Sequence, residues 1–288
     1  MKKTKNSVML SALLSIILSA FILESCKTIP ILKGIEKPFG IIGENADIYV
    51  YIPIEQNRNI VEQALPLAAG KDMKQVLGRT SAVYSGVFFN SGLSEVRVCA
   101  VGKYPYGMTD LFFKKKNGWE PRKTKDGYKY YESPYVDISI PSPLLACVGL
   151  GPETRKHMDE LLERMKNPTE PKFPEQFRSL ISSGSQDIGI FVTNSEFFLS
   201  GLLGVRLGLP LGKIEMYLQK DLTAAPQSKY IYNLYVEAEN PLAAKVAKTV
   251  LQKMLSTEVR VKENILIIEN GNIPESKIIT IVKSVYPH

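Results

Sequence analysis

The chain has 288 residues, of which 44% are hydrophobic and 23% are charged. This composition is typical of globular proteins, and it excludes a wholly disordered chain, a collagen-like chain and a membrane protein with many spans. The length allows one large domain or two small ones. The chain contains only two His and three Cys, which excludes most zinc sites and His-dependent catalytic triads.

The N-terminal residues have the organisation of an export signal. Lysines precede an apolar run from Val8 to Leu23, and Leu-Glu-Ser-Cys occupies residues 23–26. This ending resembles a bacterial lipobox, in which the chain is cut before a cysteine that then carries fatty acyl chains such as palmitate. The pattern predicts a signal peptide over residues 1–25 and lipidation of Cys26. The alternatives are a secreted protein with a coincidental cysteine and an uncleaved membrane anchor.

Pro- and Gly-rich stretches divide the rest of the chain. Residues 26–45 predict a flexible tether between the lipid and the fold, and residues 168–186 predict a Pro-rich link. The link separates a first α/β half, residues 46–167, from a second, residues 187–288. Both halves have the order β-α-β-β-α-β-β-α, which makes a duplication plausible.

The expected strands are rich in β-branched and aromatic residues, and the expected helices have an apolar face. In the first half these elements are a strand at Asp47–Ile52, a helix at Asn59–Ala69, strands at Ala82–Phe89 and Glu95–Val101, a helix at Thr109–Lys115, strands at Tyr128–Glu132 and Tyr135–Ile140, and a helix at Glu153–Lys166. In the second half they are a strand at Asp187–Val192, a helix at Glu196–Leu209, strands at Lys213–Gln219 and Tyr230–Glu237, a helix at Leu242–Leu255, two strands across Val259–Glu269, and a helix from Pro274. We therefore expect an α+β fold, with two packed sheets of mixed or antiparallel strands and with amphipathic helices.

The stretch from Glu196 to Leu209 predicts a helix that is apolar on every side, a property of helices buried in a core or placed in lipid. Its expected lipid contacts are Phe197, Phe198, Leu199, Leu202, Leu203, Val205, Leu207 and Leu209. Its glycines lower the helix stability by ~1 kcal/mol each relative to Ala. The helix therefore depends on its surroundings, and the core and lipid are equal alternatives.

Two further helices are amphipathic. The helix at Leu242–Leu255 has lysines outside its apolar face, which suits an anionic membrane surface. The helix at Asn59–Ala69 has a similar apolar face. The expected lipid contacts of these two helices are Ile60, Val61, Leu65, Val246, Val250 and Leu251. The alternative is that each helix is half exposed and covers a sheet.

The two internal cysteines lie in apolar, strand-like contexts. Cys99 and Cys147 are each flanked by Val and Ala. An oxidising envelope allows a disulfide between them, and two buried free thiols are the alternative.

The sequence contains no pattern typical of a catalytic site. Ser-x-x-Lys, Gly-x-Ser-x-Gly and His-Glu-x-x-His are absent. His157 lies beside Arg155 and Lys156, which predicts a solvated side chain. We expect no catalytic residue, no metal and no cofactor, so the protein is predicted not to be an enzyme.

The lipobox at residues 23–26, with Glu in its second position, and the helices Asn59–Ala69, Glu196–Leu209 and Leu242–Leu255 together suggest a family. In these features the chain resembles the treponemal outer-membrane-associated lipoproteins. The resemblance implies attachment to the inner leaflet of the outer membrane. It also implies that amphipathic helices insert when the protein passes from a closed to an open form, and that bilayer permeability changes. Lys27, after Cys26, is compatible with sorting to the outer membrane.

The net charge is +7, and removal of residues 1–25 leaves +5. On an exported chain this favours membrane lipids as partners, not nucleic acid. The leading hypothesis is a lipid-anchored, non-enzymatic protein on the periplasmic face of the outer membrane that enters or contacts the bilayer through its helices. It would alter permeability or aid the transfer of lipids or solutes. The alternatives are a carrier that holds a fatty acid in an apolar cavity and an adaptor that binds another envelope protein.

Overall fold

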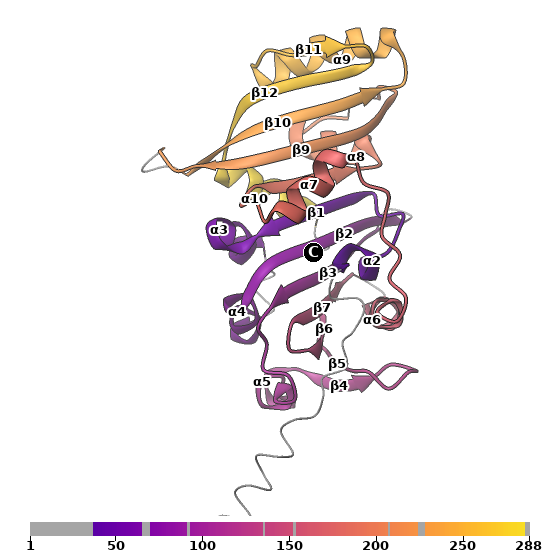
Figure 1. Cartoon of the computed structure of the whole chain (residues 1–288), viewed down its shortest axis with the longest axis vertical. Coiled ribbons are helices and arrows are strands. Elements are labelled where there is room, and N and C mark those ends of the chain that lie inside the picture. Colours follow the sequence, from indigo (N-terminus) through magenta and orange to yellow (C-terminus); the bar gives the residue numbers. More distant parts are fainter. Residues whose placement is uncertain are drawn as a thin grey trace, which may run out of the picture. The chain divides into compact units, whose positions relative to one another are not determined.

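The computed structural model describes residues 37–64, 70–90, 93–134, 136–151, 154–206, 208–223 and 228–285. In this part of the chain, twelve strands form one sheet in which every neighbouring pair is antiparallel (Figure 1). In sheet order the strands are β11 (Arg260–Lys262), β12 (Ile265–Pro274), β10 (Lys229–Ala238), β9 (Leu211–Asp221), β8 (Ile188–Val192), β1 (Ile48–Pro53), β2 (Thr80–Asn90), β3 (Leu93–Gly102), β7 (Leu145–Leu150), β6 (Asp137–Ser142), β5 (Lys129–Glu132) and β4 (Glu120–Lys123). The predicted α+β class is confirmed.

The expectation of two packed sheets is wrong, because the two sets of strands are joined edge to edge in this single sheet. The joint is the antiparallel pair β1–β8, in which Ile48 lies opposite Val192 and Tyr51 opposite Gly189. Outward from this pair, the order on one side begins β2-β3-β7-β6 and on the other side is β9-β10-β12-β11. The organisation into two similar halves stays a prediction.

Because side chains alternate along a strand, the sheet has two different faces. The aromatic face, named for Tyr49 and Phe191, carries α2 (Pro38–Ile42), α6 (Thr154–Arg164) and α7 (Glu175–Ser183). The aliphatic face, named for Ile48, Val50 and Ile52, carries α3 (Ile54–Ala64), α4 (Gly70–Gly78), α8 (Ser195–Leu203), α9 (Pro241–Leu255) and α10 (Glu275–Val285). Between β3 and β4 lie α5 (Thr109–Phe112) and the 3-10 helix η2 (Lys115–Asn117).

The aromatic face corrects the expected extent of the tether. Residues 26–45 were expected to be flexible, but α2 is buried throughout. The ring of Phe39 on this helix lies 5.6 Å from that of Tyr49 and 5.0 Å from that of Phe173. Apolar burial thus fixes residues 38–42 to the sheet. Residues 1–36, and with them the predicted signal peptide and Cys26, lie outside the described residues.

The segment expected to be a Pro-rich link also contributes to this face. Helix α7 lies within residues 168–186 but was not predicted. Its apolar pattern is short, and the prolines before it are typical of a link. Phe177 on α7 is fully buried, and its ring lies 4.9 Å from that of Phe173.

Among the described residues, no helix is both long and apolar enough to cross a bilayer. The same residues include no group of three or more His, Cys, Asp or Glu side chains placed to hold a metal ion.

Candidate lipid-contacting surfaces

Helix α9 follows the sequence prediction closely and exposes apolar side chains. Asn240 caps it by accepting a hydrogen bond from the N–H of Ala243 over 2.9 Å, and Pro241 starts its first turn. Leu251 is fully buried against the sheet. On the outer side, Leu242 is 72% exposed and Val246 is 43% exposed.

The exposed apolar side chains of α9 form one stripe, because residues four apart share a helix side. The α9 stripe consists of Leu242, Val246, the half-buried Val250 and Met254. Lys245 and Lys253 are exposed on the same helix. An apolar stripe beside lysines has the chemistry of an anionic lipid surface.

Helix α8 is shorter than expected. It ends at Leu203, and Gly204 caps it with a left-handed backbone at φ 76°, which favours glycine and stops the helix. Phe198, Leu199 and Leu202 are buried in the core, whereas Phe197 and Val205 are 43% and 47% exposed. The segment is thus core on one side and exposed on the other.

Phe197 is nevertheless held by a ring contact. Its ring stacks on that of Phe89 with centroids 4.3 Å apart. The remaining expected contacts of this segment are the half-buried Leu203 and Leu209, which pack against the core, and Leu207, which lies outside the described residues.

Helix α3 turns its apolar face inward. It was expected at Asn59–Ala69 but begins at Ile54, and Leu65 lies outside the described residues. Ile60 and Val61 are buried. In this structure they therefore contact protein, not solvent.

Ile60 and Val61 line an apolar cavity between the aliphatic face and the helices α3, α8 and α10. Its volume is about 90 Å³. Strand side chains such as Val50 and Val87 form its floor, and Phe198 and Ile281 contribute from the helices. The cavity is small beside ligand pockets, which measure roughly 300–1,000 Å³.

Polar contacts hold α3 and α10 at one end of this cavity. Asn59 donates to Glu275, the first residue of α10. Glu275 also lies 3.6 Å from the ammonium group of Lys220, which donates to Gln56 O over 2.9 Å. The N-terminal turns of both helices are thus tied to the sheet.

Cys99 and Cys147 are free, buried thiols in the structure. They lie directly opposite each other on β3 and β7. Burial raises the pKa of the Cys99 thiol well above its ordinary value, which makes this sulfur unreactive.

The expectation of a solvated His157 is wrong. Its side chain is buried, and Nδ1 lies 2.8 Å from Glu95 Oε1. Arg97 pairs with Glu95 and, over 2.8 Å, with Glu160 on α6. Burial alone would raise the pKa of Glu95, but hydrogen bonds from His157 and Arg97 outweigh it and hold that pKa below its ordinary value.

The structure adds exposed apolar residues to the lipid contacts that the sequence predicts. They include Leu242 and Met254 of the α9 stripe, and Tyr106, Met108, Leu111 and Leu144 beyond it. Leu242 and Met254 are separated from Val246 by multiples of four residues, so the helical periodicity of the sequence places all three on one side of the helix. The other four lie in turns and a four-residue helix, where no periodic pattern exists.

The comparisons with known proteins agree on one family. Residues 33–279 match the family model described as outer membrane-associated lipoprotein TP0453. The chain is 34% identical over 253 residues to outer membrane protein TP0453 of Treponema pallidum (strain Nichols), covering 86% of each chain.

Solved structures of TP0453 have the same fold. Crystal form I is 33% identical in sequence, covers 87% of this chain and 98% of its own, and has a TM-score of 0.76. Crystal form III is 32% identical in sequence, covers 86% of this chain and 98% of its own, and has a TM-score of 0.72. The chain therefore belongs to the TP0453 family of outer membrane-associated lipoproteins.

Proposed function

We propose that the protein is a non-enzymatic lipoprotein that is anchored through Cys26 and contacts the inner leaflet of the outer membrane with the α9 stripe. The observation that carries this proposal is the exposure of Leu242, Val246 and Met254 on a helix whose opposite side is buried. Membership of an outer membrane-associated lipoprotein family supports it.

The energies favour contact without any rearrangement of the fold. Moving a Leu, Val or Met side chain fully out of water contributes about 1.5–3 kcal/mol. Each lysine near an anionic surface contributes about 1 kcal/mol more, and Lys245 and Lys253 are both exposed. The stripe therefore adds a second attachment beside the acyl anchor. One acyl chain by itself gives only reversible membrane binding.

The helices above the cavity supply further apolar surface if they leave the sheet. A void of about 90 Å³ removes roughly 2 kcal/mol of packing energy, at about 24 cal/mol per Å³. Helices α3, α8 and α10 are thus held less firmly than a filled core would hold them. The weaker packing supports a second step after contact of the α9 stripe, in which the inner faces of these helices, including Ile60 and Phe198, insert into the bilayer.

The cavity argues against the alternative of a fatty-acid carrier. Its lining is apolar apart from Ser85, as an acyl chain requires. Its volume, however, is below the roughly 300 Å³ at which ligand pockets begin. We therefore favour contact with the bilayer over storage of a lipid.

Vesicle flotation tests the α9 stripe. The protein is the mature chain with Cys26→Ala, so that no acyl chain contributes. Val246→Glu places a charge in the stripe, and binding to phosphatidylglycerol vesicles should fall by roughly tenfold or more. Leu222→Glu is the matched control, because Leu222 is 73% exposed on the β9–β10 turn, outside the stripe. Equal binding of the two variants would contradict the proposal.

Lipidation of Cys26 is tested separately in the native host. The wild-type chain should partition into detergent, and Cys26→Ala should stay in the aqueous phase. Partition of a processed Cys26→Ala protein into detergent would show that another group anchors the chain.

A further inference from the structure

The loop that connects β3 to α5, and α5 itself, expose apolar side chains that the proposed function does not use. Tyr106, Met108 and Leu111 are 50%, 53% and 57% exposed. Leu144, on the turn between β6 and β7, is 45% exposed. The N–H of Gly102 donates to Leu144 O over 3.1 Å, so this turn lies beside the start of the loop. We name Tyr106, Met108, Leu111 and Leu144 the α5 patch.

Buried aromatic residues fix the loop at both of its ends. Before it, Tyr104 is buried with its hydroxyl 2.9 Å from Thr80 Oγ1. After it, the buried ring of Phe113 lies 5.0 Å from the ring of Trp119 and 4.9 Å from that of Tyr131. The chain thus places its anchoring rings in the core and leaves the intervening apolar side chains outside. Clustered exposed apolar side chains of this kind mark an interaction site.

A tight turn shapes the patch. The N–H of Met108 donates to Pro105 O over 3.1 Å, and Gly107 has φ 83°. A left-handed residue in third position is the signature of a type II turn, which requires glycine there. The turn sets Tyr106 and Met108 on either side of Gly107 in a fixed geometry.

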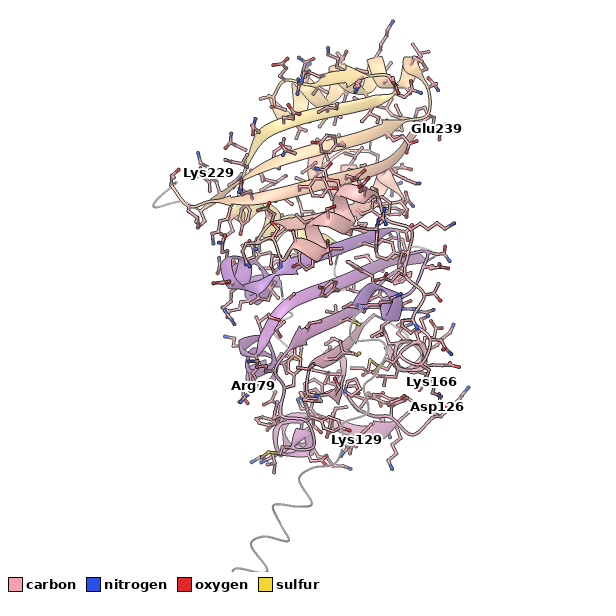
Figure 2. All side chains as sticks on the ribbon, viewed as in Figure 1. Arg79, Asp126, Lys129, Lys166, Lys229 and Glu239 are labelled. Carbon is pink, nitrogen blue, oxygen red and sulfur yellow. The ribbon has the colours of Figure 1, made fainter. Side chains whose placement is uncertain are left out.

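The charges around the α5 patch are predominantly basic. Arg79, Lys103, Lys114 and Lys116 are exposed, and none forms an ion pair with another described residue. Two carboxylates also lie nearby. Asp110 pairs with Lys129 and accepts a hydrogen bond from Tyr131, and Asp72 accepts hydrogen bonds from Asn117 and Trp119. Figure 2 shows Arg79 and Lys129 at the part of the sheet where α5 lies.

We propose that the α5 patch is a second lipid-contacting site, separate from the α9 stripe, and that its ligand is the surface of an anionic phospholipid bilayer. Apolar side chains on a rigid loop enter the boundary between headgroups and acyl chains, and unpaired lysines beside them bind the phosphates. The proposal rests on the proposed function only in requiring a bilayer within reach. The two sites belong to different elements, since α9 packs on β10, β11 and β12, so each can be removed alone.

A fluorescent label at single positions separates the two sites. The mature chain with Cys26→Ala and Met108→Cys is labelled in the folded state with an environment-sensitive dye, which the buried Cys99 and Cys147 do not take up. Val246→Cys reports on the α9 stripe, and Leu222→Cys is the control. On phosphatidylglycerol vesicles, the labels at 108 and 246 should shift to the blue and the label at 222 should not. Vesicles of phosphatidylcholine alone should give a weaker shift at 108.

An unlabelled variant tests the contribution to binding. Met108→Ser with Leu111→Ser should weaken binding to phosphatidylglycerol vesicles by about fivefold to tenfold, whereas Leu222→Ser should leave it unchanged. An unshifted label at 108 with a shifted label at 246 overturns this proposal and leaves the proposed function standing. A shifted label at 108 with an unshifted label at 246 supports this proposal and overturns the proposed function. If the double variant changes only self-association of the chain, the patch joins copies of the protein and the proposal is wrong.

Discussion

The hydroxyl of Tyr230 on β10 donates a hydrogen bond of 2.8 Å to Oδ1 of Asn57 on α3. The amide of Asn57 in turn donates to Pro53 O over 2.9 Å and to Gln186 O over 3.0 Å. A single buried side chain thus connects α3, the end of β1 and the segment before β8. These contacts fix the N-terminal end of the helix that covers the cavity.

Asn57→Ala should lower the free energy of unfolding by about 1–3 kcal/mol, because it leaves the buried Tyr230 hydroxyl without its acceptor. Chemical denaturation measures this change. Tyr230→Phe removes the other partner, so the double variant should lose less than the sum of the single losses. Strict additivity would show that the two side chains do not act together.

Val87→Ile should stabilise the protein. Val87 lines the cavity, and one added methylene that fills a void contributes about 0.8 kcal/mol. Val148 is buried on the same face but does not line the cavity, so Val148→Ile should destabilise by about 1–3 kcal/mol through overpacking. Urea denaturation compares the two. An equal loss in both variants would mean that the void does not accept a methyl group.

Glu95 should make stability depend on pH. Its pKa is lowered in the folded state from an ordinary value of 4.5, so its contribution is complete above about that pH and is lost as the pH falls through the lowered pKa. Glu95→Gln lacks this titration and leaves Arg97 without its charged partner. The difference in stability between wild type and variant should therefore be largest at pH 7 and shrink on acidification. A difference that is independent of pH would contradict this role of Glu95.

Cys99 and Cys147 should not react with a thiol reagent while the protein is folded, because both are buried and burial raises the pKa of Cys99. In denaturant, the mature Cys26→Ala chain should titrate two thiols. A chain from the envelope that titrates none without reductant would show that the cross-strand pair is a disulfide in the cell.

Much of the fold could be predicted from local pattern. Helix α9 and strand β1 match their predicted ranges to within one residue because their apolar periodicity is undisturbed. Strand β7 was missed, since its residues are all buried and show no alternation. The single sheet also could not be predicted, because the β1–β8 pairing joins residues far apart in the chain.

The candidate site was predicted only in part, for a related reason. An apolar face indicates burial or lipid contact equally, and for Ile60, Phe198 and Leu251 the structure shows burial. Val246 is exposed because the sheet covers a different side of α9. Only tertiary packing distinguishes the two kinds of apolar residue.

The environment of residue 246 on a bound vesicle tests the central claim most directly. A dye on Val246→Cys of the mature Cys26→Ala chain should shift to the blue on phosphatidylglycerol vesicles, and lipids with quenchers on their acyl chains should quench it. An unshifted, unquenched dye on chains that float with the vesicles would contradict the claim that the α9 stripe contacts lipid.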